Sequence, residues 1–267
     1  MRRWLFLAGC GIFAVMLATV PVRAGETVES FSLRDGSAFN VLVIDPGDTT
    51  TAVVLFTGGN GVVNIPDDGQ IGKNNNFLVR SRDRFADNGL ITGVIDAPED
   101  RRDGNGLKDG FRVSVEHAAD VGAVIARLRA RGASKVWLAG TSRGSISAVG
   151  AAALLGPAPK GPDGIVLTSS VVVPGNDPDT VLDADLARIT VPALIAHHEK
   201  DVCVVSSFSD IGPMKDGLSS VADLELMVIK GGSAGKAKNA CKGKSHHGFQ
   251  GIEDRVVAAI SDWIKGH

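Results

Sequence analysis

The feature that most constrains this chain is a repeated alternation of short apolar, β-rich segments with longer segments of helical character. Strands are predicted over residues 39–44, 51–56, 90–95, 136–139, 165–167, 193–196 and 224–229. Helices are predicted over residues 77–86, 113–130, 142–155 and 252–264. In residues 113–130, apolar side chains recur three and four positions apart, as on one face of a helix. Strands that alternate with helices indicate a mostly parallel sheet covered by helices on both faces.

The first 24 residues have the features of a signal peptide. Arg2 and Arg3 precede an apolar run from Trp4 to Val20, and Val22–Ala24 resembles a cleavage site. We therefore expect residues 1–24 to be removed and residues 25–267 to form a single domain in the periplasm or outside the cell. An uncleaved membrane anchor is the alternative, although the apolar run is at the short end for a span. We expect no stable membrane insertion after cleavage.

Cleavage would also change the charge and the cysteine content. It removes three arginines and no acids, so Lys plus Arg falls from 28 to 25 against 30 Asp plus Glu, a formal net charge of −5. A mildly acidic chain argues against nucleic acid as a partner. Cys203 and Cys241 are then the two remaining cysteines, and in an oxidising compartment such a pair predicts a disulfide.

Ser142 is the predicted nucleophile. It lies in Gly140–Gly144, which matches the G-x-S-x-G pattern of a serine on a tight turn between a strand and a helix. Ser233 lies in a second match, Gly231–Gly235. Only the first match has a predicted strand before it and an apolar helix after it, whereas Ser233 is followed by a lysine-rich segment. We therefore interpret Ser233 as a loop residue.

The acid and the base follow from their order along the chain. A serine hydroxyl needs a base to accept its proton and an acid to orient that base, in the chain order serine, acid, histidine. Asp201 follows the predicted strand 193–196 and is favoured over Glu199, which lies nearer the end of that strand. His247 is favoured as the base over His246, because it lies directly before a flexible Gly-Phe pair.

Backbone amides are the predicted donors to the oxyanion. One comes from Arg143, directly after the nucleophile, and the other from Gly59 or Asn60 in the glycine-rich segment after strand 51–56. A phosphate-binding loop is the alternative for that segment, but it lacks the G-x-G-x-x-G and P-loop patterns, so no cofactor is expected.

The two cysteines lie close in sequence to the predicted acid and base. Cys203 is two residues after Asp201 and Cys241 is six residues before His247, so contact between acid and base would also bring the two sulfurs together. Zinc binding by both cysteines and the neighbouring histidines is the alternative, but no tight ligand pair is present and no metal is expected.

Together these residues resemble the α/β-hydrolase superfamily, in particular the small lidless esterases and dienelactone-hydrolase-like proteins. The resemblance extends over nearly all of residues 25–267. It implies a three-layer α/β fold with about eight mostly parallel strands and a cofactor-free acyl-enzyme mechanism. In that mechanism Ser142 attacks, His247 transfers the proton and Asp201 orients the imidazole. Thr57 is a departure, because many members have histidine before the oxyanion glycine.

The leading hypothesis is a serine esterase that acts on a small-molecule acyl substrate. A peptidase or amidase would use the same triad, and the sequence does not separate these activities. A non-catalytic binding protein on the same fold is the hypothesis of a different class.

Overall fold

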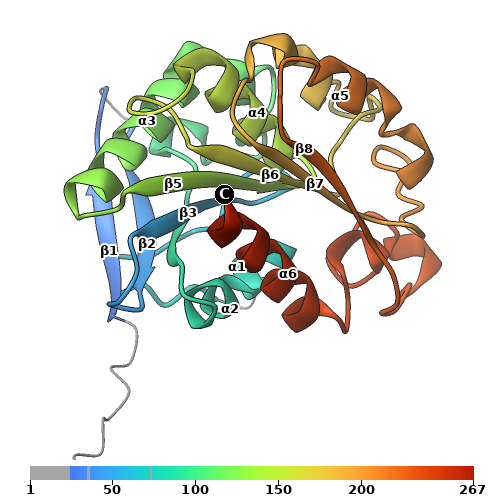
Figure 1. The fold of residues 1–267 in the computed structure, drawn as a ribbon, viewed down its shortest axis with the longest axis horizontal. Helices are drawn as coiled ribbons and strands as arrows, with labels where there is room; N and C mark the ends of the chain where they lie inside the picture. Colours follow the sequence, from blue (N-terminus) through green and yellow to red (C-terminus); the bar gives the residue numbers. More distant parts are fainter. Residues whose placement is uncertain (1–24, 35–36, 73) are drawn as a thin grey trace, which may run out of the picture.

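The computed structural model describes residues 25–34, 37–72 and 74–267, so the predicted signal peptide lies outside the described residues. Its centre is an eight-stranded sheet in the order β1-β2-β4-β3-β5-β6-β7-β8 (Figure 1). The strands are β1 (Gly25–Phe31), β2 (Phe39–Asp45), β3 (Thr51–Phe56), β4 (Ile91–Ile95), β5 (Lys135–Thr141), β6 (Gly164–Thr168), β7 (Ala193–His198) and β8 (Leu224–Ile229). The predicted mostly parallel sheet is therefore confirmed.

Pairing along the sheet is parallel from β4 to β8, whereas β2 runs antiparallel to both β1 and β4. Six of the predicted strands lie in the parallel part and one is β2. The eighth strand, β1, was not predicted from the local pattern. It pairs with β2 alone at the sheet edge and is mostly exposed, so its sequence carries little of the apolar character that marks a buried strand.

Six α-helices cover the two faces of the sheet in the described part of the chain. They are α1 (Phe77–Arg80), α2 (Arg82–Asp87), α3 (Val115–Ala130), α4 (Gly144–Leu155), α5 (Gly212–Gly217) and α6 (Glu253–Gly266). Figure 1 shows α3, α4 and α5 on one face and α1, α2 and α6 on the other. Each face has its own apolar core, so the sheet is the middle layer of three.

All four predicted helices have different bounds in the structure: the one predicted over 142–155 begins at Gly144, and the one predicted over 252–264 is α6. The other two differences have local causes. The predicted helix 77–86 is divided at Ser81, whose amide still bonds to carbonyls of α1 while its own carbonyl accepts from Arg84 and Phe85. Val113 does not belong to α3, because Ser114 is extended and caps the helix through the amide of His117. Backbone hydrogen bonds at Ser81 and a side-chain cap at Ser114 thus override the apolar periodicity from which the two helices were predicted.

The parallel strands bring the loops that follow them to one edge of the sheet. The sheet contains four adjacent parallel strands, in the order β3, β5, β6 and β7, so their carboxyl ends lie at the same edge. Ligand sites of open α/β sheets lie at this edge. Within the described ranges, no helix combines the length and the apolar character that crossing a bilayer requires.

Candidate active site

Ser142 occupies a strained turn between β5 and α4. Its φ angle is +54°, in the left-handed region that residues with a Cβ rarely adopt. The turn is fixed by a hydrogen bond from the Ser142 amide to the carbonyl of Thr168 at the end of β6, 2.9 Å long. Ser145 stabilises it further, because its Oγ donates to the Ser142 carbonyl at 2.6 Å. The turn therefore holds the Ser142 side chain at the carboxyl edge of the sheet.

The glycines on both sides of Ser142 are required by close backbone contacts. A Cβ on Gly140 would lie 2.3 Å from the carbonyl oxygen of Gly144. A Cβ on Gly144 would lie 2.1 Å from the carbonyl oxygen of Phe56, at the end of β3. Both distances are far shorter than any real contact, and the atoms that would have to move belong to the backbone. Each of the two glycines in the sequence pattern is therefore required by a different backbone contact.

His247 and Asp201 form a buried pair at the same edge. The Nδ1 atom of His247 lies 2.9 Å from Oδ2 of Asp201 and 3.0 Å from Oγ of Ser206. Both residues are almost fully buried. With Nδ1 protonated and donating to Asp201, the Nε2 atom of His247 is left with a lone pair. That Nε2 atom is buried and has no hydrogen-bond partner among the described residues.

Asp201 is held in its ionised form. Burial on its own would raise its pKa, but hydrogen bonds from His197, His247 and the Cys203 amide outweigh burial and lower the pKa to about 2. His197 lies on the other side of this carboxylate, with Nε2 3.5 Å from Oδ2 of Asp201 and 2.9 Å from the carbonyl of Ser206. Asp201 is thus a carboxylate between two histidines at neutral pH.

The competing residues lie elsewhere. His246 stacks on His198, with ring centroids 4.1 Å apart, and its Nδ1 lies 3.1 Å from the carbonyl of Lys200. Glu199 forms an ion pair with Lys230. Ser233 lies in an exposed loop after β8, with no helix directly after it. None of these three lines the pocket that contains Ser142 and His247.

The loop after β3 brings further glycines close to Ser142. A Cβ on Gly58 would lie 3.0 Å from the Ser142 Cβ, so the backbone of this loop packs directly against the serine. Gly58 and Gly59 both line the pocket, whereas Asn60 does not. The carbonyl of Asn60 accepts from Leu107, and its side-chain oxygen accepts from Val62. Gly58, which was not predicted, thus lies against Ser142 and lines the pocket, and it joins Gly59 as a candidate second donor.

Arg143 is the N-cap residue of α4, so its amide belongs to the helix end whose N–H groups have no partner within the helix. The amide stands directly after Ser142, at the positive end of a 12-residue helix. The Arg143 side chain turns away to form an ion pair with the buried Asp177. Its amide remains the first predicted oxyanion donor.

A buried arginine fixes the orientation of the loop after β3. Arg112 donates to the carbonyls of Thr57 and Gly59 at 3.4 and 3.3 Å, and to Oγ of Ser147 at 2.7 Å. Burial, and then the nearby Arg143 charge, lower its pKa to about 9, so it is still a cation at neutral pH. Since C=O and N–H are antiparallel across a trans peptide, the Gly58 amide points away from Arg112.

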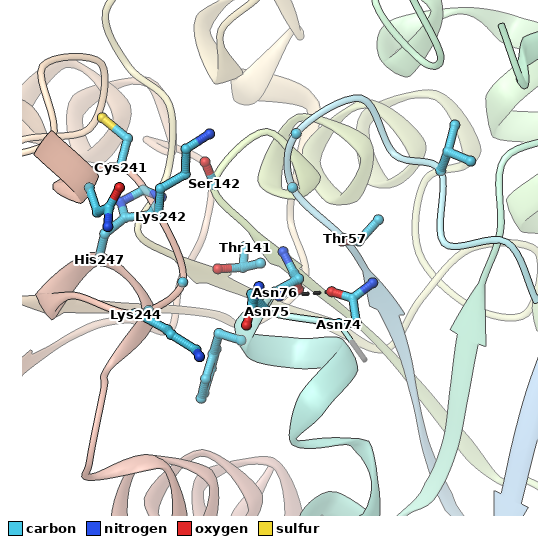
Figure 2. Close-up of a pocket in the computed structure, with 17 residues that line it drawn as sticks. Thr57, Asn74, Asn75, Asn76, Thr141, Ser142, Cys241, Lys242, Lys244 and His247 are labelled. Carbon is cyan, nitrogen blue, oxygen red and sulfur yellow. Dashed lines mark hydrogen bonds between the residues drawn. The ribbon is translucent and has the colours of Figure 1, made fainter. Parts of the chain in front are cut away.

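Ser142, His247 and the glycines of the loop after β3 line one pocket of about 530 Å³. Figure 2 shows Ser142 between the loop that carries Lys242 and His247 and the loop that carries Thr57. The volume is within the range of small-molecule sites. Its lining residues are Thr57, Gly58, Gly59, Val62, Asn74, Asn75, Asn76, Phe77, Thr141, Ser142, Asn239, Cys241, Lys242, Gly243, Lys244, His247 and Gly248.

Two cross-links hold the base-bearing loop in place. Cys203 and Cys241 form a disulfide with an S–S distance of 2.09 Å, as predicted, and it joins the loop after Asp201 to the loop before His247. Arg80 of α1 donates to the carbonyls of Gly243 and Gly248 and forms an ion pair with Glu253 of α6. Among the described residues, no group of three or more acidic, histidine or cysteine side chains is arranged to hold a metal ion.

Several residues of the site were not predicted from the sequence. Arg112 and Arg80 reach the site from distant segments, whereas His197 and Ser206 lie within five residues of Asp201, and none of the four belongs to a motif. Ser169 also had no prediction, although it directly follows β6 and its Oγ donates to the His247 carbonyl at 2.8 Å. The position of Ser169 after a buried strand, at the same edge as Ser142, is the signal that could have identified it.

Solved structures with the same fold include several hydrolases at low sequence identity. Dienelactone hydrolase from Anabaena variabilis is 17% identical and aligns over 92% of this chain and 99% of its own, with a TM-score of 0.65. An esterase from Pyrococcus furiosus is 12% identical over 91% and 93%, with a TM-score of 0.63. A lidless serine hydrolase from Xanthomonas campestris is 15% identical over 92% and 94%, with a TM-score of 0.53.

These similarities show that the chain has the α/β-hydrolase fold, which confirms the predicted fold class. No protein-family model and no curated protein matches the chain.

Proposed function

We propose that this protein is an exported serine hydrolase that cleaves a carboxylic ester through an acyl-enzyme. The observation that carries the proposal is that Ser142 and His247 line one pocket and that His247 is bonded to Asp201. A strained serine and a buried histidine line the pocket, the histidine has one free nitrogen, and its other nitrogen is bonded to a carboxylate. A hydroxyl, a base with a free lone pair and an acid that orients the base are the groups that nucleophilic catalysis by a hydroxyl requires, and they support the proposal.

In the first half of the reaction, Oγ of Ser142 forms a bond to the ester carbonyl carbon while Nε2 of His247 takes the hydroxyl proton. Asp201 stabilises the imidazolium that results. The amides of Arg143 and of Gly58 or Gly59 donate to the oxyanion. When the C–O bond to the alcohol breaks, His247 gives its proton to the departing oxygen.

The second half repeats these steps with water. His247 accepts a proton from the water while the water oxygen forms a bond to the acyl carbon. When the bond between that carbon and Oγ of Ser142 breaks, His247 returns the proton to Oγ. The carboxylic acid leaves and the free enzyme is restored. The overall reaction consumes one ester and one water and needs no cofactor. The substrate is a small molecule, in keeping with the size of the pocket.

The disulfide supports the expected location in the periplasm or outside the cell. Disulfides persist in oxidising compartments and are rare in the cytosol. The predicted signal peptide over residues 1–24 is in keeping with the same location.

The chain offers matched control variants for a test of the triad. Hydrolysis of 4-nitrophenyl acetate is measured for Ser142→Ala and His247→Ala beside Ser233→Ala and His246→Ala. We expect kcat to fall about 10⁴-fold or more in the first pair, as for loss of a triad member. The second pair should stay near the wild-type value. Loss of activity in Ser233→Ala or His246→Ala, or retention in Ser142→Ala, would overturn the proposed roles.

A further inference from the structure

The pocket beside Ser142 has an unusual balance of charge. Its lining includes two lysines and four asparagines but no aspartate or glutamate, and Val62 and Phe77 are its only large apolar side chains. The protein as a whole has a formal net charge of −2, so this local excess of positive charge runs against the average. With only two large apolar side chains, the pocket has no extended apolar wall for a long hydrocarbon chain.

The positive charge comes from one segment. Residues 230–252 contain five lysines and no acid, and two of the five, Lys242 and Lys244, line the pocket. Neither of these two forms an ion pair with any described residue, whereas Lys230 pairs with Glu199. Figure 2 shows Lys242 and Lys244 on the loop that also carries Cys241 and His247. Their ammonium groups are therefore available to a ligand in the pocket.

The asparagines opposite this loop present donors to the pocket. The side-chain oxygen of Asn76 caps α1 by accepting from the amides of Leu78 and Val79, at 3.1 and 3.4 Å. The side-chain oxygen of Asn74 accepts from the Asn76 amide at 2.8 Å. Because both oxygens are occupied by backbone, the NH₂ groups are the ends left for a ligand. The Asn76 Nδ2 atom is 3.4 Å from where a Cβ on Gly58 would be.

The backbone segments that carry these donors are fixed before a ligand binds. Arg80 donates to the carbonyl of Asn75 at 2.6 Å and to that of Gly243 at 2.9 Å, so one side chain joins the asparagine segment to the lysine segment. The disulfide at Cys241 anchors the second of these segments beside Lys242. Donors held in place by backbone contacts lose less freedom on binding than mobile ones.

From this excess of N–H donors and cations we infer that the preferred substrate is an ester bearing a carboxylate or similar anionic group. The inference rests on the proposed function and adds the substrate class to it. The anionic group would be bound by Lys242 and Lys244 together with the amide groups of Asn74 and Asn76, while the ester carbonyl lies at Ser142. Lys236 and Lys238 lie on the same loop outside the pocket and provide a matched control.

The test compares two pairs of esters that differ in one charge. The 4-nitrophenyl monoester of adipic acid and its terminal carboxamide place the charge in the acyl portion. 4-Acetoxybenzoate and 4-acetoxybenzamide place it in the leaving group. The ratio of kcat/KM, anionic over neutral, is measured in wild type, Lys242→Gln/Lys244→Gln and Lys236→Gln/Lys238→Gln. Each double variant removes two positive charges from the loop.

We expect a ratio of about 10 or more in at least one pair for wild type. It should fall to within about threefold of unity in Lys242→Gln/Lys244→Gln and stay near the wild-type ratio in the control. Raising the salt from 0.1 to 1 M should lower the wild-type ratio, because the screening length shortens from about 10 to about 3 Å. This salt effect distinguishes charge recognition from a change in pocket shape.

Two contrary outcomes have different meanings. Wild-type ratios near unity in both pairs, or an equal fall in the two double variants, would overturn the substrate class while leaving the hydrolase intact. Absence of turnover of all four esters would instead overturn the proposed function, and the substrate class with it.

Discussion

The φ angle of +54° at Ser142 predicts that the nucleophile is retained at the expense of stability. A residue with a Cβ in this region is destabilised by about 1–2 kcal/mol, whereas glycine is not. Glycine also has more conformational freedom in the unfolded chain, and this offsets about 0.5–1 kcal/mol of the stability gained by removing the Cβ. Ser142→Gly should therefore be more stable than Ser142→Ala by about 0.5–1 kcal/mol, although both variants lack the nucleophile.

Thermal unfolding of the two variants measures this difference. For a domain of this size, 1 kcal/mol corresponds to about 2–4 °C in Tm, so the glycine variant should melt about 1–4 °C higher. Ala151→Gly in the interior of α4 is the control, because there glycine should lower stability by about 1–2 kcal/mol through helix propensity and the loss of a buried methyl group. A Ser142→Gly protein that melts at or below Ser142→Ala would refute the reasoning that the turn is strained.

Three further predictions concern groups around the site. Asn76→Ser keeps the cap on α1 but removes the NH₂ group proposed to bind the anionic group, so kcat/KM for the anionic esters should fall about tenfold with little change in Tm. Cys203→Ser/Cys241→Ser opens a loop with a sequence separation of 38 residues, which should lower the unfolding free energy in urea by about 3–4 kcal/mol. Burial, and then the charges of Arg112 and Arg34, lower the pKa of His117 to about 3, below its ordinary value near 6.5. The unfolded chain therefore binds a proton first as the pH falls, and stability should drop from about pH 6.5 to pH 3 by up to about 1.4 kcal/mol per pH unit. His117→Phe should flatten that slope, and an unchanged slope would contradict a buried neutral histidine.

The fold could be predicted from the sequence because its buried strands are short apolar runs between helical segments. The exposed edge strand β1 could not, since nothing buries its side chains. The division of the helix at Ser81 depends on hydrogen bonds that no periodicity records.

The candidate site also has features that the sequence predicts and features that it does not. The surroundings of Ser142 distinguish it from Ser233 in the sequence itself, because a strand before it and an apolar helix after it are both local features. Gly58 becomes a candidate oxyanion donor, beside Gly59 and Asn60, only because its backbone packs against Ser142. The role of Arg112 depends on contacts with residues more than 50 positions away in the chain. Such contacts are set by the tertiary structure and leave no local pattern.

The most direct test of the central claim is covalent labelling of the folded protein with a fluorophosphonate, followed by peptide mass spectrometry. The account predicts one adduct, on Ser142, that is lost in Ser142→Ala and strongly reduced in His247→Ala. Ser233→Ala should label like wild type. An adduct on Ser233, or no adduct on Ser142 in folded protein, would contradict the claim that Ser142 is an activated nucleophile.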